Sequence, residues 1–243
     1  MADAQGKQVN IVPDAAVNTE ERRRARIRME LAANHYQQRN YQTALEELRT
    51  ALEIDPEYSA AYGMLGLIYM DLGDKLRAES SFKRALELSP GNPDLNNNYG
   101  WFLCQTGRVR ESIERFELAA SDRLYTVPGK PLHNAGVCLR KIGDDAGAER
   151  YLQRAFRIDP SNPVAMYNLS EIYLGRADLE RARFYAQRLV TSLDPAPSTL
   201  WLALRVERAL GNRDGVLSLG TQLRRRFPGS REAGLLREGK FDE

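Results

Sequence analysis

The sequence predicts an all-α fold in which helical hairpins are stacked one after another. Two observations lead to this prediction: a short motif recurs at a fixed spacing, and each recurrence spans two amphipathic segments separated by a turn. Residues 51–56 read ALEIDP, and residues 85–90, which lie 34 positions later, read ALELSP. A fixed period of this length is typical of helical repeat proteins, in which each repeat buries its apolar face against its neighbours.

The same motif locates the remaining repeats. A third copy, AFRIDP at residues 155–160, follows the second by two periods plus two residues, so one divergent copy lies between them. In that copy Tyr99 and Gly100 align with Leu65 and Gly66, and Val127-Pro128 are the two extra residues. We therefore divide the chain into six repeats, at residues 25–58, 59–92, 93–126, 129–162, 163–196 and a degraded 197–230.

Apolar periodicity predicts two helices in each repeat. In the second repeat, residues 65–69 form an apolar first helix, and residues 72–74 (Leu-Gly-Asp) form the turn. The second helix is indicated by Ala78, Phe82 and Ala85, at i, i+4 and i+7. Residues 89–93 carry two prolines, which end this helix and begin the next, because proline is tolerated in the first turn of a helix but not in its interior.

Small residues recur at one place in each hairpin and predict close helix packing. Gly66, Gly100 and Gly136 lie within first helices, where glycine costs about 1 kcal/mol relative to alanine. We expect them to face a column of small residues on the second helices, with a bulky column filling the space between neighbouring repeats. The small column is Ala44, Ala78, Ser112, Ala148 and Ala182, and the bulky column is Leu48, Phe82, Phe116 and Leu152. Val216 and Gly220 depart from both columns, which fits a decayed terminal repeat.

The two ends of the repeat array have recognisable signals. Asn18, with Glu21 in the first turn, indicates the start of the first helix, and residues 1–17 are expected to be a flexible tether. Residues 18–239 are expected to form a single solenoid, closed by a short helix that Ser230 caps. The arginine runs at 22–26 and 224–226 are interpreted as solvated helix faces.

Composition and motifs exclude several classes of function. The chain has 243 residues and a net charge of +2, which does not favour a nucleic-acid binder, because such a protein neutralises phosphate groups with an excess of basic residues. It has no apolar run long enough to cross a membrane. His35 and His133 lie in separate repeats, and two cysteines are too few for a four-thiolate zinc site. Without a phosphate-binding loop or a catalytic constellation, we expect no enzymatic activity, no metal, no cofactor and no nucleic-acid partner.

The pattern resembles the tetratricopeptide repeat, a 34-residue helix–turn–helix, over roughly residues 25–230. This resemblance implies a right-handed superhelix of six repeats, whose first helices line a concave groove that binds a protein segment. The places that form a carboxylate clamp in some members carry other residues here, which argues against a reader of chaperone tails. Six candidate partner-binding residues lie on first helices: Asn96, Asn97, Trp101, Arg140, Lys141 and Tyr167.

Alternatives stay open for two of these candidates. Trp101 either anchors a partner in the groove or is partly buried between the third and fourth repeats. The run of asparagines at 96–98 either recognises polar groups of a partner or is simply tolerated at a helix N-terminus after Pro93.

Cys104 and Cys138 lie on first helices of adjacent repeats, offset by two residues relative to the repeat. Two residues correspond to about 200° around a helix, which turns the two thiols toward each other across a helix–helix contact. The spacing of packed helices then allows a disulfide, which would indicate an oxidising compartment. The alternative is two buried free thiols in a cytosolic protein.

A narrower resemblance rests on two stretches of sequence. Residues 97–104, NNYGWFLC, and residues 223–230, LRRRFPGS, resemble the PilF/PilW proteins of type IV pilus biogenesis. This resemblance implies a non-enzymatic lipoprotein on the periplasmic face of the outer membrane that assists assembly of the secretin pore or of another pilus component. The lipid anchor that it implies is absent from this sequence. The alternatives are a cytosolic adaptor that binds a peptide segment of a client, and a regulatory subunit that recruits an enzyme.

Overall fold

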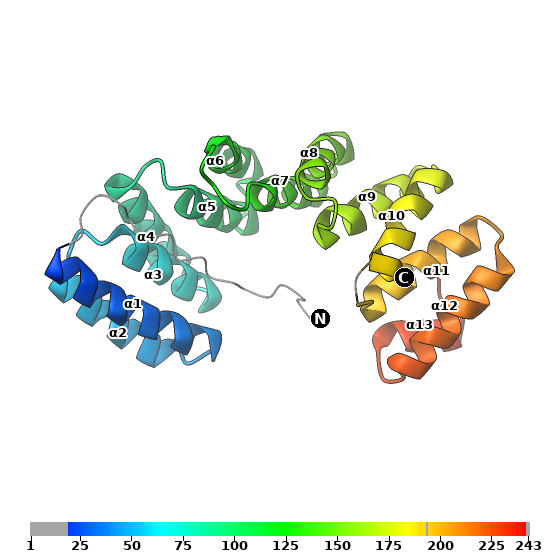
Figure 1. Cartoon of the computed structure of the whole chain (residues 1–243), viewed down its shortest axis with the longest axis horizontal. Helices are drawn as coiled ribbons and strands as arrows, with labels where there is room; N and C mark the ends of the chain where they lie inside the picture. Colours follow the sequence, from blue (N-terminus) through cyan, green and yellow to red (C-terminus); the bar gives the residue numbers. More distant parts are fainter. Residues whose placement is uncertain (1–18, 193, 242–243) are drawn as a thin grey trace. The chain divides into compact units, whose positions relative to one another are not determined.

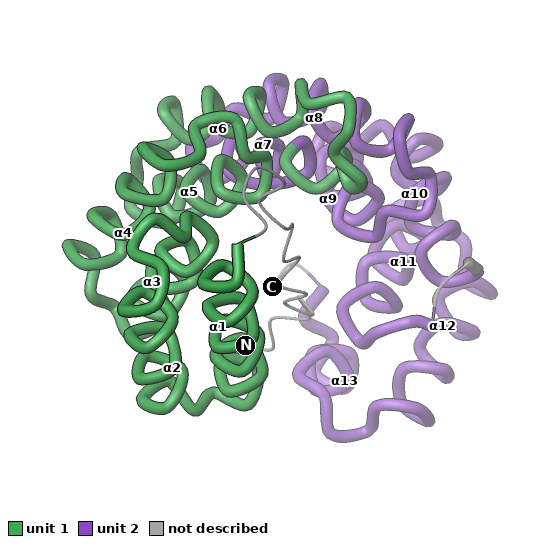
Figure 2. The backbone as a smooth tube through the Cα atoms, turned by 60° about the vertical axis from the view of Figure 1, so that its left-hand side comes forward, with its two compact units in different colours: residues 1–131 green, residues 132–243 purple. Residues whose placement is uncertain are grey.

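In the computed structural model, residues 19–192 and 194–241 are described, and this part of the chain contains thirteen α-helices and no strand (Figure 1). The chain divides into two compact units, residues 1–131 and residues 132–243 (Figure 2). Unit 1 contains α1 (Glu20–Gln37), α2 (Tyr41–Ile54), α3 (Ser59–Asp71), α4 (Lys75–Leu88), α5 (Pro93–Gln105) and α6 (Val109–Ser121). Helix α7 (Gly129–Lys141) begins in unit 1 and continues in unit 2. Unit 2 also holds α8 (Asp145–Ile158), α9 (Pro163–Gly175), α10 (Leu179–Ser192), α11 (Pro197–Ala209), α12 (Arg213–Arg226) and α13 (Arg231–Glu238).

Consecutive helices pair into hairpins at the positions of the six expected repeats, so the predicted all-α repeat fold is confirmed. Each hairpin turn contains one residue in the left-handed backbone region, which glycine adopts without strain. Two turns lack glycine, and there Arg39 and Ala177 adopt φ angles of 60° and 56°. The other four turns use Gly73, Gly107, Gly143 and Gly211.

The glycines of the first helices make room for the bulky residue of their own hairpin. A Cβ atom on Gly66 would lie 2.6 Å from the ring of Phe82, and one on Gly136 would lie 2.5 Å from Leu152. The bulky column therefore packs into the helix pair itself, and not only between neighbouring repeats as expected. The helix backbones are also close, because Ser170, at the glycine position of α9, donates a hydrogen bond to the carbonyl oxygen of Ala182 (2.9 Å).

The last hairpin has the same packing with the large and small residues exchanged. Leu204 occupies the glycine position of α11 and is fully buried, while Gly220 occupies the bulky position of α12. A Cβ on Gly220 would lie 3.6 Å from Leu204 and 3.2 Å from Leu236 of α13. The side-chain volume of the pair is thus kept, and Gly220 also admits α13, so the apparent decay of this repeat is a compensated exchange.

The ends of the helix array are capped by side chains. Thr19 caps α1, and its hydroxyl accepts a hydrogen bond from the backbone N–H of Arg22. Asn18 and the expected tether at residues 1–17 lie outside the described residues. Ser230 caps α13 as predicted, accepting from the N–H of Ala233 at 3.1 Å.

Candidate functional site

The first helices of unit 2 are joined by pairs of polar side chains. Arg140 of α7 donates from Nη1 to Oδ1 of Asn168 on α9 at 2.8 Å. Arg205 of α11 donates from Nη1 to Oε1 of Glu171 on α9 at 2.9 Å. We call these four residues, together with Tyr167 of α9, the first-helix face of unit 2.

Tyr167 lies among these charges. Its phenol pKa is raised above the ordinary value, first by burial and then by the carboxylate of Glu171, while the guanidinium groups of Arg205 and Arg140 act in the opposite direction. The face therefore combines a half-buried aromatic ring with two guanidinium groups whose charges act on it.

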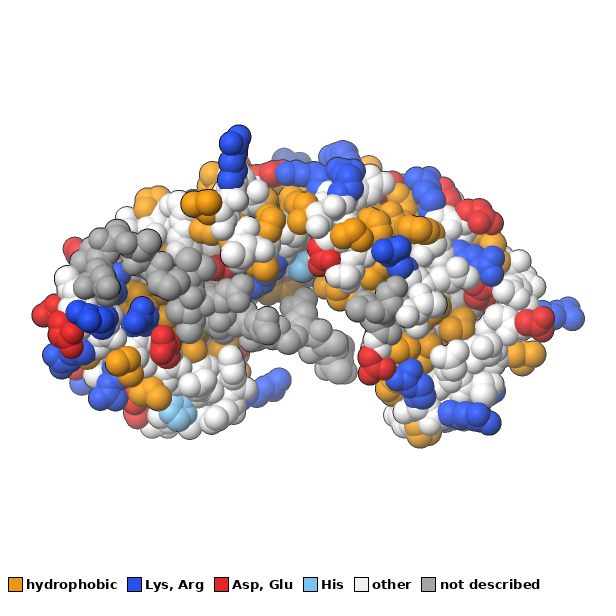
Figure 3. Space-filling view, viewed as in Figure 1, with side chains coloured by type: hydrophobic (Ala, Val, Ile, Leu, Met, Phe, Trp, Pro, Cys, Tyr) orange, Lys and Arg blue, Asp and Glu red, His pale blue; other side chains and the backbone are white. Residues whose placement is uncertain are grey.

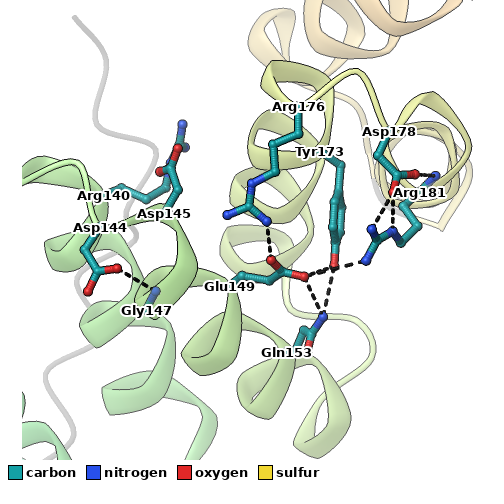
Figure 4. A network of polar contacts seen from close by, with 10 residues as sticks. All are labelled: Arg140, Asp144, Asp145, Gly147, Glu149, Gln153, Tyr173, Arg176, Asp178 and Arg181. Carbon is teal, nitrogen blue, oxygen red and sulfur yellow. Dashed lines mark hydrogen bonds and ion pairs between the residues drawn. The ribbon is translucent and has the colours of Figure 1, made fainter.

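Arg140 is held in place but keeps some contact with solvent. Its side chain is 28% exposed, and its Nε lies 3.7 Å from a carboxylate oxygen of Asp145 (Figure 4). The Nε atom is buried without a hydrogen bond. A guanidinium ordered in this way can bind a backbone carbonyl or a carboxylate of a partner, and little further ordering is needed. Lys141, next in the chain, is exposed.

A second polar network holds α9 against α8 (Figure 4). The hydroxyl of Tyr173 donates to Oε1 of Glu149 at 2.6 Å, and Nη1 of Arg176 donates to Oε2 of the same carboxylate. Burial raises the pKa of Glu149, but these hydrogen bonds outweigh it, and the pKa lies below its ordinary value. The carboxylate thus stays ionised at neutral pH and fixes the helix that carries Tyr167.

The other three partner-binding candidates lie on α5 of unit 1. Asn96 and Asn97 are each 1% exposed. The amide nitrogen of Asn96 donates to the carbonyl oxygens of Pro90 and Asn92, which closes the connection between α4 and α5. Trp101 is half-buried and keeps part of its side chain at the surface.

The two cysteines lie in different units. Cys104 is on α5 of unit 1, Cys138 is on α7 of unit 2, and both are buried. A disulfide between them stays a prediction.

Sequence reasoning missed three residues of the first-helix face of unit 2, namely Asn168, Glu171 and Arg205. A signal for one pair was present, because Glu171 and Arg205 are one repeat length apart and have opposite charges. Equivalent positions in consecutive repeats lie side by side, so a pair of this kind predicts an ion pair between neighbouring first helices.

The described residues outside this face show few other features that indicate chemistry. Within residues 19–192 and 194–241, no three His, Cys, Asp or Glu side chains gather closely enough to hold a metal ion. Helices long and apolar enough to cross a bilayer are also absent from this part. On the surface that Figure 3 shows, blue Lys and Arg side chains are interspersed with red Asp and Glu side chains.

Comparison with known proteins finds the repeat family first. Profiles of the tetratricopeptide repeat match residues 29–93, 81–114 and 143–198. Among curated proteins, the type IV pilus assembly protein PilF of Pseudomonas aeruginosa is 28% identical over 204 residues, which are 84% of this chain and 81% of PilF.

Two solved structures are similar over nearly their whole length. PilW, described as a widely conserved type IV pilus biogenesis factor, is 30% identical with a TM-score of 0.77, covering 87% of this chain and 97% of PilW. The structure of Pseudomonas aeruginosa PilF is 25% identical with a TM-score of 0.80, covering 91% of this chain and all of PilF.

Proposed function

Because this chain belongs to the PilF/PilW family of tetratricopeptide repeat proteins, we propose that it is a non-enzymatic scaffold for type IV pilus biogenesis. Its partner in this proposal is the secretin or another pilus assembly component, and it acts by docking, without making or breaking a covalent bond. The observation that carries the proposal is the first-helix face of unit 2, where Arg140 and Arg205 are each held by a hydrogen bond to α9, the helix that carries the half-buried ring of Tyr167.

The chemistry of this face suits an extended protein segment. Arg140 of the face, and Lys141 beside it in the chain, supply N–H donors to carbonyl or carboxylate oxygens, and Tyr167 supplies apolar area with a polar end. The ion pair of Arg205 with Glu171 holds α9 and α11 in register before a partner arrives. Such preorganisation lowers the entropy lost on binding. In unit 1, Trp101 is the candidate whose exposed surface fits a partner contact.

We place this scaffold on the periplasmic face of the outer membrane, attached by a lipid anchor that the family resemblance implies. An oxidising periplasm agrees with a bridge between Cys104 and Cys138. The compartment is tested by labelling thiols under denaturing, non-reducing conditions in protein taken from its native cell fraction. Two reactive thiols per chain would contradict an oxidised periplasmic protein.

The binding proposal is tested by replacing Arg140 and Tyr167 with alanine, singly, in the native organism. Arg150→Ala is a matched control, because Arg150 is an exposed arginine on α8 outside the face. The readouts are the fraction of secretin in the multimeric form and the number of surface pili. We expect both to fall several-fold in the two face variants and to stay at the wild-type level in the control.

The same variants distinguish the rival function. If the face variants leave the secretin and the pili unchanged at normal protein levels, and pulldowns recover only cytosolic clients, the protein is a cytosolic adaptor and the pilus proposal is wrong.

A further inference from the structure

Two residues of α11 repeat the arrangement of the first-helix face of unit 2. Trp201 follows Tyr167 by one repeat length, and Arg208 follows Arg140 by two repeat lengths, so each pair occupies equivalent helix positions. The aromatic ring and the cation that we assign to partner binding on α7 and α9 therefore recur on α11.

On α11 these two positions are already occupied by the end of the chain itself. The ring of Phe241 stacks on Trp201, with centroids 5.6 Å apart and an angle of 11° between the planes. The guanidinium carbon of Arg208 lies 4.1 Å from the centre of the same Phe241 ring. Trp201 and Arg208 thus enclose an aromatic side chain, and we call this place the aromatic slot.

A local turn delivers Phe241 to the aromatic slot. Helix α13 packs on α11 and ends at Gly239, whose φ of 69° reverses the chain. The backbone N–H of Lys240 then donates to the carbonyl oxygen of Leu235 at 3.0 Å, which closes a Schellman turn. Phe241 comes directly after this turn and stays partly exposed.

We propose that the aromatic slot binds an aromatic side chain from an extended segment of a partner protein, and that Phe241 is an internal stand-in which this side chain displaces. The inference rests on the proposed function, since it extends the same binding face by one repeat. A second observation supports it: Trp201 is 5% exposed, and its indole Nε1 is buried without a hydrogen-bond partner. The stacked Phe241 ring covers the face of the indole and leaves this N–H, at the ring edge, without an acceptor, whereas an extended partner segment brings backbone carbonyl groups that can accept it.

The contacts of Phe241 are weak enough to exchange. One stacked aromatic pair and one exposed cation–π contact together favour the closed tail by roughly tenfold to fiftyfold over the open tail. From these two contacts alone, we expect an empty slot in roughly a few per cent of the molecules. A partner consequently binds with an apparent affinity that is reduced by this fraction.

The test uses the full chain carrying Phe241→Ala, which empties the aromatic slot. The probe is the acetylated heptapeptide REGKFDE, which copies residues 237–243, and a matched peptide carries alanine in place of phenylalanine. Binding is followed by the NMR signal of the Trp201 indole N–H, which a spectrum of Trp101→Phe distinguishes from the signal of Trp101. We expect saturable binding of REGKFDE to Phe241→Ala, at least tenfold weaker binding to the wild-type chain, and no binding of the alanine peptide.

A second variant tests the role of the cation. Arg208→Ala in the Phe241→Ala background should weaken binding of REGKFDE at least threefold. If circular dichroism shows that Phe241→Ala is unfolded, the role of Arg208 is tested with Arg208→Ala alone, in a chain that keeps Phe241. Loss of the cation should then release Phe241 and shift the NMR signal of the Trp201 indole N–H.

Equal binding of REGKFDE to the wild-type and Phe241→Ala chains would overturn the proposal, as would no binding to a folded Phe241→Ala chain at millimolar peptide. An unchanged Trp201 signal in Arg208→Ala would do the same. These results concern purified protein and a peptide. The proposal for the aromatic slot can therefore be wrong while the secretin and pilus readouts of the Arg140 and Tyr167 variants still support the proposed function. The proposed function can equally be wrong while the peptide experiment supports the aromatic slot.

Discussion

Replacing Gly66 with alanine tests whether the glycine of a first helix is required by the bulky residue beside it. The added Cβ would lie 2.6 to 2.8 Å from three ring carbons of Phe82, well inside the usual contact distance of about 3.5–4.0 Å. Phe82 is fully buried and is flanked by the rings of Tyr99 and Phe102 at centroid distances of 5.9 and 5.7 Å, so it has little room to move.

The expected magnitude follows from two opposing terms. Overpacking a rigid site costs up to about 3 kcal/mol, and alanine regains about 1 kcal/mol of helix propensity. Gly66→Ala should therefore lower the free energy of unfolding by about 2 kcal/mol. The control is Gly175→Ala in α9, where a Cβ meets no atom within 4 Å and the variant should be slightly more stable than the wild type.

The assay is urea denaturation followed by far-ultraviolet circular dichroism, with Phe82→Leu and the double variant included. Because leucine removes ring atoms that the new Cβ would strike, Gly66→Ala should cost much less in the Phe82→Leu background than in the wild type. The reasoning is refuted if Gly66→Ala and Gly175→Ala shift stability equally, or if the cost of Gly66→Ala is the same in both backgrounds.

Three further variants test other features by the same denaturation measurement. Ala177→Gly should stabilise the protein by about 0.5–1 kcal/mol. The left-handed backbone costs alanine about 1–2 kcal/mol, and the greater freedom that glycine gives the unfolded chain offsets only part of this. A loss of stability in this variant would contradict the prediction. Burial raises the pKa of Asp94, so ionisation of this carboxyl group opposes folding. Asp94→Asn keeps the hydrogen bond from Tyr125 and should be more stable than the wild type at pH 7, with this advantage lost near pH 4. An advantage that stays constant with pH would argue against titration of Asp94 as its cause. Hydrogen bonds, the strongest of them from Arg108, lower the pKa of Glu79 to about 2. The stability that these bonds give is therefore present above about pH 4.5 and is lost toward pH 2. Glu79→Gln should lower the free energy of unfolding by about 1 kcal/mol at pH 7 and by almost nothing at pH 2.5.

The helical hairpins could be predicted from sequence because their signals are local. Apolar spacing and turn residues act within one repeat, the 34-residue period compares one repeat with the next, and all three agree in placing the helices. The sequence shows Gly220 as a departure from the bulky column, and the compensation by Leu204 is not visible when each column is compared separately. Only the two columns taken together show that the volume in the hairpin is kept.

The candidate site was less predictable because it depends on the path of the backbone. The burial of Asn96 follows from two carbonyl groups in the loop before α5, and no periodicity indicates where those groups point. The ion pair of Glu171 with Arg205 follows from the stacking of equivalent positions and could have been found. Arg140 and Tyr167 were predicted as contact residues, but the hydrogen bond that ties Arg140 to Asn168, next to Tyr167 on α9, required the structure.

The reversed Leu204 and Gly220 pair restricts how this array can be shuffled by recombination. A crossover that joins α11 to the second helix of the second, third or fourth repeat would bring Leu204 against a phenylalanine or leucine. The opposite crossover would set the glycine of one of these repeats against Gly220 and leave a void. Either chimera would be poorly packed at that single point. The two helices of the last hairpin are therefore matched to each other, and exchanging either one alone disturbs the packing.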